Sequence, residues 1–201
     1  MTESYKTIKT TSEGTYKEKG SKFMAFALPV NSVDEVKEIV RNYRKEYYDA
    51  RHVCYAYVLG PDKSESRAND DGEPSGTAGR PILGQINSFG LTNVLVVVVR
   101  YFGGILLGTG GLATAYKEAS ADALNSAEII DKTVENSISI QFGYLQMNDV
   151  MRIVKDTNAR ITKQDFDNVC KIDVSIDQHD MPVFISKMEK IGGVGIDVGG
   201  D

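Results

Sequence analysis

Three carboxylates lie within four residues of this sequence, at Asp70, Asp71 and Glu73. Carboxylate oxygens are the ligands that Mg²⁺ prefers, so a hard-cation site is one interpretation, although the spacing does not match an EF-hand loop. The alternative is a structural turn whose carboxylates accept backbone N–H groups and pair with Arg67 or Arg80. We assign no metal to this segment. The glycines that would let it fold tightly are Gly72, Gly76 and Gly79.

A second glycine-rich segment follows a run of six aliphatic residues at 94–99. Residues 108–113 fit the pattern G-x-G-x-x-A that opens a helix in dinucleotide-binding folds. Residues 100–107 separate this pattern from the strand, however, whereas the dinucleotide turn is tight, and no further βαβ units follow. A Walker P-loop is excluded because its Lys-Ser/Thr pair is missing. Two interpretations remain: an anion site at a helix N-terminus, or glycines that permit close packing of a loop on a sheet.

Basic and aromatic residues accompany both segments. Surfaces that combine arginine with exposed rings bind RNA through phosphate contacts and base stacking. Each residue is also explicable as a surface cation or a core ring, and His52, at the start of an apolar strand, fits a structural role. No Ser-His-Asp or Cys-His set can be assembled, which argues against a hydrolase. The set comprises Arg51, His52, Arg67, Arg80, Arg100, Tyr101, Phe102, Tyr116 and Lys117.

The composition limits the class of protein. A chain of 201 residues is long enough for two modest domains that each bury a core. Its formal net charge of −5 disfavours nucleic-acid binding by bulk charge, but a local basic groove is compatible with it. No apolar run approaches the roughly 20 residues of a membrane span, and the first residues lack the apolar segment of a secretion signal. Cys54 and Cys170 are too few for a disulfide framework. We therefore expect a cytoplasmic protein with no membrane contact.

Hydrophobic periodicity places the candidate segments on an α+β framework. Ser32 and Glu35 form a capping box that begins a helix, which we expect to end near Tyr48. Residues 62–81 contain no large apolar side chain, and so long a loop in a compact domain is usually functional or mobile. The other elements expected in a first domain, residues 1–130, are a hairpin at 15–30, strands at 52–59 and 94–99, and helices at 82–89 and from 112 to about 126.

The remainder of the chain has the pattern of a separate domain, residues 134–201, after a polar boundary at 128–135. The expected order is βαββαβ, which is the ferredoxin-like arrangement. One helix is expected to begin at Asp180 as its cap, with Pro182 in its first turn. The strands are expected at 137–142, 161–166, 169–176 and 194–198.

Four strings of sequence resemble the signatures of the YigZ/IMPACT family: KGSKF at 19–23, RHVCYA at 51–56, RANDDGEPSGTAGRPIL at 67–83 and VVRYFGGILLGTGGLATAY at 98–116. The resemblance implies that the first domain has the α+β fold of a ribosomal-protein domain. This fold also occurs in domain IV of elongation factor G and in GHMP-type kinases. The second domain would resemble domain V of elongation factor G. Eukaryotic members regulate translation under amino-acid starvation by competing for a protein partner of a stress kinase. They carry an additional N-terminal domain, so their partner is not carried over to this chain.

These observations predict a regulator of translation or of a stress response that binds RNA or a ribosome- or translation-associated partner, with no assigned cofactor or catalytic residue. The alternative is an enzyme or sensor that binds a phosphorylated small molecule at the glycine-rich loop. We expect a cleft with the loop 70–80 as one wall and residues 100–111 as the other. The predicted site residues are Arg51, His52, Arg67, Asp70, Asp71, Gly72, Glu73, Gly76, Thr77, Gly79, Arg80, Arg100, Tyr101, Gly103, Gly104, Gly108, Gly110 and Lys117.

Overall fold

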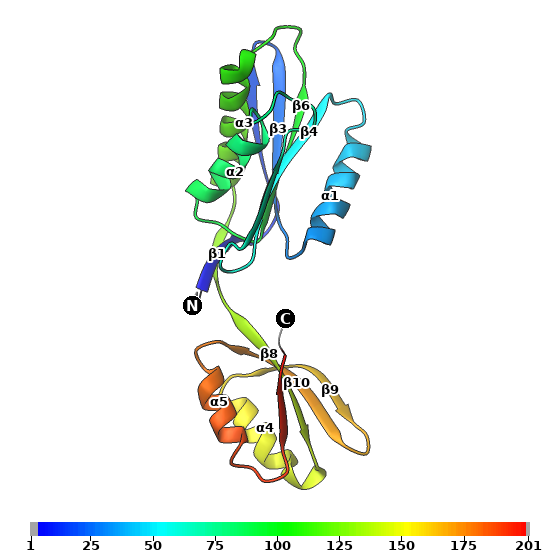
Figure 1. The fold of residues 1–201 in the computed structure, drawn as a ribbon, viewed down its shortest axis with the longest axis vertical. Helices are drawn as coiled ribbons and strands as arrows, with labels where there is room; N and C mark the ends of the chain where they lie inside the picture. The colour runs from blue at the N-terminus through cyan, green and yellow to red at the C-terminus, as the bar shows by residue number, and fades with distance from the viewer. Residues whose placement is uncertain (1–3, 200–201) are drawn as a thin grey trace. The chain divides into compact units, whose positions relative to one another are not determined.

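The computed structural model describes residues 4–199 (Figure 1). The chain divides into two compact units, of which one ends at Lys132 and the other begins at Thr133. Each unit combines antiparallel strands with helices that are interspersed among them, so the α+β class predicted from the sequence is confirmed. In the described part of the chain, no helix is both long and apolar enough to cross a membrane.

The first unit is built on a five-stranded sheet of order β2-β3-β6-β4-β5, in which neighbouring strands are antiparallel. The central strand is the aliphatic run, and every residue from Val94 to Arg100 is buried. Tyr101 ends the strand and is partly exposed. The bounds are β2 (Ser12–Glu18), β3 (Ser21–Pro29), β4 (His52–Leu59), β5 (Glu65–Asn69) and β6 (Val94–Tyr101).

Both faces of this sheet are covered, which explains why β6 is apolar without alternation. Helices α2 (Gly79–Ser88) and α3 (Gly108–Asn125) lie on one side, and α1 (Val33–Glu46) lies on the other, as Figure 1 shows. Successive side chains of a strand point to opposite faces. Val94, Val96 and Val98 therefore pack with α2 and α3, whereas Leu95, Val97 and Val99 pack with α1. By the same alternation, Arg100 falls on the face that α2 and α3 cover.

The start of α1 follows the predicted capping box. The Glu35 N–H donates to Ser32 Oγ at 3.2 Å, and the Glu35 carboxylate accepts the N–H of Asn31 at 2.8 Å. Val36 and Val40 bury the inner face of the helix against the sheet. The helix ends at Glu46, close to the expected end near Tyr48.

The segment 62–81 is not the continuous loop that the sequence suggested, because it contains β5 and the first residues of α2. β5 pairs with β4 at the edge of the sheet, and Glu65, Ser66 and Arg67 are exposed. A polar edge strand has no apolar alternation that a sequence pattern could detect. Helices α2 and α3 also begin earlier than expected. The sequence did not predict their first turns, because these turns are rich in glycine, which has a low helix propensity.

The first and last segments of this unit form a separate two-stranded sheet. β1 (Ser4–Ile8) pairs with β7 (Ile129–Thr133). The polar region at 128–135, which we had expected to be only a boundary, is therefore largely a strand. Its side chains are mostly exposed, so its composition gave no strand signal.

The second unit has the expected βαββαβ order around a sheet of order β11-β8-β10-β9. Its two main helices cover one face of the sheet, where Ile138, Ile140 and Phe142 are buried. Asp180 is at the N-cap position of α5, but its side chain makes no capping hydrogen bond, so that detail of the prediction was wrong. The bounds are β8 (Glu135–Phe142), η1 (Tyr144–Gln146), α4 (Met147–Asp156), β9 (Arg160–Phe166), β10 (Cys170–Asp177), α5 (Met181–Met188) and β11 (Gly195–Val198).

Close packing of β2 against α3 generates a stability prediction. A Cβ added at Gly14 would lie 2.1 Å from the backbone nitrogen of Ala123, and backbone cannot move aside cheaply. We expect Gly14→Ala to lower the free energy of unfolding by about 1–3 kcal/mol. Gly84 is the matched control, because it lies within α2 with no atom within 4 Å of an added Cβ. Gly84→Ala should raise stability by up to about 1 kcal/mol. Urea denaturation measures both, and equal midpoints for the two variants would contradict the packing.

Candidate functional site

Asp70 fixes the loop between β5 and α2. Its carboxylate accepts the N–H groups of Gly76 at 2.8 Å, Ala78 at 3.1 Å and Gly79 at 2.8 Å. It thereby caps the N-terminus of α2, where unpaired N–H groups favour an anion. Burial raises the pKa of Asp70, but the three N–H bonds outweigh burial and hold its pKa below the usual value. Asp70 is therefore occupied by the backbone of its own loop.

Asp71 joins the same loop to β4 and α1. Its carboxylate accepts the N–H of Val53 at 2.7 Å and pairs with Arg44 at 2.7 Å. Its carbonyl oxygen lies 2.7 Å from His52 Nδ1. A carbonyl can only accept, so we assign the proton to Nδ1, which leaves Nε2 of the neutral ring as an acceptor. Asp71 itself adopts a left-handed backbone with φ of 42°.

Glu73 is at the centre of a buried network. Its Oε1 accepts from Arg100 NH1 at 2.5 Å and from the Tyr116 hydroxyl at 2.8 Å. The Cys54 thiol donates in turn to the Tyr116 oxygen at 3.3 Å. Burial raises the pKa of both Tyr116 and Cys54, so both stay protonated at neutral pH. His52 Nε2 lies 3.8 Å from Glu73 Oε2.

The three loop carboxylates thus point to different partners and do not converge on a common point. Among the described residues, no group of three or more His, Cys, Asp or Glu side chains is arranged to hold a metal ion. The structural-turn interpretation accounts for Asp70. The arginines that pair with the other two carboxylates are Arg44 and Arg100, and not Arg67 or Arg80 as expected.

Two arginines meet an aromatic ring at the end of β6. The guanidinium carbon of Arg51 lies 5.5 Å from the centre of the Phe102 ring, and that of Arg100 lies 5.7 Å from the same ring. Arg100 also lies 5.5 Å from the ring of Phe23. These distances permit cation–π attraction. Arg100 is only 5% exposed, and its Nε has no hydrogen-bond partner among the described residues.

These groups border a pocket of about 350 Å³, which we call the Arg100 pocket. It is formed where the start of β4, the loop 72–74, the end of β6 and the first turn of α3 meet. No side chain of the described residues caps α3, so the N–H groups of its first turn are free for a ligand. The lining residues are Arg51, His52, Gly72, Glu73, Pro74, Arg100, Phe102, Leu106, Leu107, Gly108, Thr109 and Leu112.

The loop 70–80 and the segment after β6 therefore lie together, as the expected cleft required. Of the predicted residues, Arg51, His52, Gly72, Glu73, Arg100 and Gly108 line the pocket. Others shape the loop without lining it: Asp70, Asp71, Gly76, Thr77 and Gly79. Thr77 donates to the Pro74 carbonyl at 2.7 Å, and a Cβ at Gly79 would lie 2.5 Å from the Asn69 nitrogen.

The remaining predicted residues do not line the pocket. Arg67 is on the exposed edge strand β5, and Arg80 is exposed in the first turn of α2. The Tyr101 hydroxyl donates to Asp49 at 2.9 Å. Lys117 borders a separate pocket between α2 and α3. The last of them are the glycines Gly103, Gly104 and Gly110.

Gly103 packs backbone to backbone against the turn between β2 and β3. A Cβ there would lie 1.9 Å from the carbonyl carbon of Gly20, and the Gly103 N–H donates to Ser21 Oγ at 3.1 Å. Gly104 has a φ of 88°, and no atom lies within 4 Å of an added Cβ. Gly110 has equally open surroundings. The segment 103–107 is thus held at its first residue.

Several lining residues were not named among the predicted site residues, although all but Leu112 lie within the two predicted walls: Pro74, Phe102, Leu106, Leu107, Thr109 and Leu112. A signal for the leucines existed, because residues 105–107 are large and apolar yet lie between glycines. Leu106 is 83% exposed, which is unusual for so large an apolar side chain. An exposed apolar side chain beside a basic group is typical of a binding surface.

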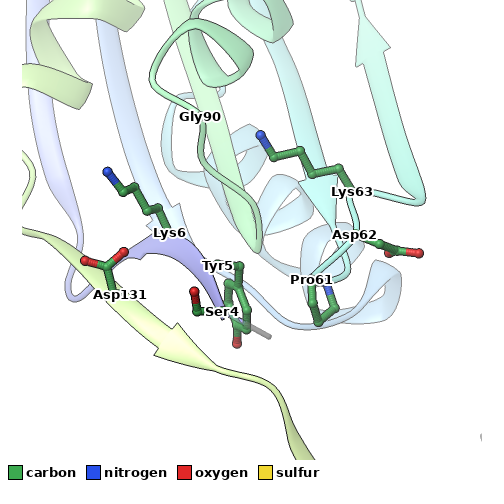
Figure 2. A pocket seen from close by; sticks show the side chains of 8 residues that line it. All are labelled: Ser4, Tyr5, Lys6, Pro61, Asp62, Lys63, Gly90 and Asp131. Atoms are coloured by element: carbon green, nitrogen blue, oxygen red, sulfur yellow. The ribbon is translucent and has the colours of Figure 1, made fainter. Parts of the chain in front are cut away.

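A second pocket, of about 380 Å³, lies beside the β1 strand (Figure 2). Figure 2 shows Lys6 and Lys63 with Tyr5 and Asp131 at its border. None of the predicted site residues lines it. No buried charge network like that of Glu73 is found among its lining residues, so we do not place the site there.

Comparison with known proteins places these features in a group of relatives. The family model described as the Impact N-terminal domain matches residues 19–124. The chain is 36% identical over 172 residues to "IMPACT family member YigZ" of Escherichia coli (strain K12), covering 85% of this chain and 84% of that protein. It is 28% identical over 191 residues to "IMPACT family member YvyE" of Bacillus subtilis (strain 168), covering 95% and 88%. A crystal structure described as that of a hypothetical protein matches over the whole of both chains, with a TM-score of 0.79 and 30% identity.

The Asp70 cap generates a pH-dependent prediction. We expect Asp70→Asn to lower the free energy of unfolding by about 1–2 kcal/mol at neutral pH, because a charged acceptor of three N–H groups is lost. Because the pKa of Asp70 is lowered in the folded state, its carboxylate stabilises the protein at pH values above its unfolded-state pKa of about 3.9. This stabilisation is lost as the pH falls through the folded-state pKa. The stability difference between the two proteins should therefore shrink below about pH 4.

Urea denaturation at a series of pH values measures this difference. Asp131→Asn, at an exposed aspartate of the same unit, is the control and should change stability little at any pH. A difference for Asp70→Asn that stays constant down to pH 3 would show that the carboxylate charge does not stabilise the loop.

Proposed function

The chain belongs to the IMPACT family, and we propose that it is a cytoplasmic regulator of translation whose first unit binds RNA through the Arg100 pocket. The sequence contains the signatures of this family, and the resemblance implies a role in translation. The fold alone does not carry this step, because one fold serves many functions. The proposal rests on the chemistry of the pocket.

The observation that carries the proposal is the contact of two guanidinium groups with the Phe102 ring, at 5.5 and 5.7 Å, at the border of the pocket. Phe102 is 37% exposed, so part of its ring is available for stacking. RNA-binding surfaces combine such rings with arginines that contact phosphate. Because the formal net charge of the chain is −5, the attraction for RNA must be local, and Arg51 is an exposed cation at this place.

An alternative is a sensor or enzyme for a phosphorylated small molecule at the glycine-rich segment. The free N–H groups at the start of α3 favour it, because a helix N-terminus attracts phosphate. We do not include a magnesium ion at the loop 70–73 in this alternative, since Asp70 and Asp71 are engaged by backbone N–H groups and Arg44. The ligand would be recognised directly by protein groups.

Arg51→Ala tests the RNA proposal. Arg51 is exposed and forms no buried ion pair, whereas removing Arg100 would leave Glu73 unpaired and destabilise the fold. We expect Arg51→Ala to weaken binding of a structured RNA severalfold. The slope of log affinity against log salt concentration should become shallower by about 0.7–0.9 for one lost phosphate contact. Fluorescence anisotropy with labelled RNA at several salt concentrations gives both quantities.

Arg41→Ala is the matched control, because Arg41 is an exposed arginine on α1, on the opposite face of the sheet. It should leave both affinity and slope unchanged. Equal slopes for the two variants, or no RNA binding by the unaltered chain, would contradict the proposal.

A further inference from the structure

The Arg100 pocket contains two hydrogen-bond acceptors that the described residues leave without a donor. Glu73 is buried, with 3% of its side chain exposed, and both of its hydrogen bonds go to Oε1. Oε2 is therefore the oxygen left for a ligand. His52 Nε2 lies 3.8 Å from it and is also an acceptor when Nδ1 carries the proton. The two acceptors lie side by side at the border of the pocket, so the pair suits a ligand with two adjacent donors.

The other lining residues of the pocket indicate what the rest of that ligand is like. Pro74, Phe102, Leu106, Leu107 and Leu112 give it a mostly apolar lining that suits a flat, weakly polar body. At another part of the lining, the free N–H groups at Gly108 and Thr109 favour an anion. A volume of about 350 Å³ is at the small end for ligand pockets, which suits one nucleotide.

We propose that the Arg100 pocket binds a single unpaired guanine nucleotide. The guanine N1–H and 2-amino group donate to Glu73 Oε2 and His52 Nε2, the base lies against Phe102, and the phosphate faces Arg51 and the first turn of α3. The inference rests on the proposed function where the nucleotide is part of an RNA. A free guanine nucleotide presents the same chemistry from a second source.

The other bases fit these two acceptors less well. Adenine and cytosine place an amino group beside a ring nitrogen that is itself an acceptor, and uracil places its N3–H between two carbonyl oxygens. Each would bring an acceptor against Glu73 or His52, and an acceptor that faces another acceptor leaves both unpaired. Guanine has two neighbouring donors on one edge, so it matches the pair without such a conflict.

Isothermal titration calorimetry of the full chain with GMP and IMP tests the inference, because the two nucleotides differ only in the 2-amino group. We expect GMP to bind at least about tenfold more tightly than IMP, since one hydrogen bond to a charged or buried acceptor is lost. AMP should bind more weakly than either. Equal affinities for GMP and IMP, or no binding of any nucleotide, would overturn the inference.

Two variants locate the effect in this pocket. Glu73→Gln keeps the size of the side chain but removes the charged acceptor, and it should abolish the preference for GMP over IMP. If this variant does not fold, Phe102→Leu removes a partly exposed ring and its cation–π contact with Arg100, but it keeps both partners of the Glu73–Arg100 ion pair and should weaken GMP binding severalfold. Arg41→Ala should bind GMP as the unaltered chain does. A preference for GMP that survives both pocket variants would place the ligand elsewhere and overturn the inference.

The source of the nucleotide is decided with hairpin RNAs whose loops contain either guanosine or inosine. Tighter binding of the guanosine loop, with displacement by GMP, supports the inference and the proposed function together. GMP binding with its preference over IMP, but no RNA binding, supports the inference with a free nucleotide as ligand and contradicts the proposed function. RNA binding that neither GMP displaces nor inosine weakens overturns the inference and leaves the proposed function standing.

Discussion

The first unit depends on one buried ion pair, between Glu73 and Arg100. It joins the loop before α2 to the central strand β6, and the Tyr116 hydroxyl adds α3 to the same carboxylate oxygen. Two charges in an interior are stable only as a pair, and removing one partner of such a pair typically costs about 3–5 kcal/mol. The loop cannot move away from β6 without breaking this ion pair and leaving a buried charge without a partner. The pair therefore sets the position of the pocket wall as well as its charge.

The loop is also prepared for binding before any ligand arrives. Asp70 holds it from inside through three N–H groups, and Asp71 ties it to β4 and α1. Ordering a flexible segment reduces affinity, so a loop that is already ordered loses less on binding. In this arrangement two carboxylates are structural and one reaches the pocket, although all three look alike in the sequence.

The sequence predicted those parts of the fold that depend on local pattern. The aliphatic run located β6, and the Ser32 capping box located α1. Arg100 and Glu73 could be proposed for one site because their glycine-rich surroundings were unusual, and Arg51 and His52 because they belong to the basic and aromatic set. The partners of the carboxylates could not be predicted, since Arg44 and Arg100 each lie 27 residues from the acid that they pair with. Nor could the exposed edge strand β5, whose polar side chains carry no periodic signal.

The contact between Gly103 and Gly20 has a consequence for how sequences of this kind can diverge. Neither position tolerates a side chain unless the turn between β2 and β3 retreats, because the two backbones touch. A substitution at Gly20, which is distant from the pocket in sequence, would displace the segment that carries Leu106 and Leu107 to it. The hairpin turn and the pocket rim are therefore structurally coupled, and a change in one is tolerated only together with a change in the other.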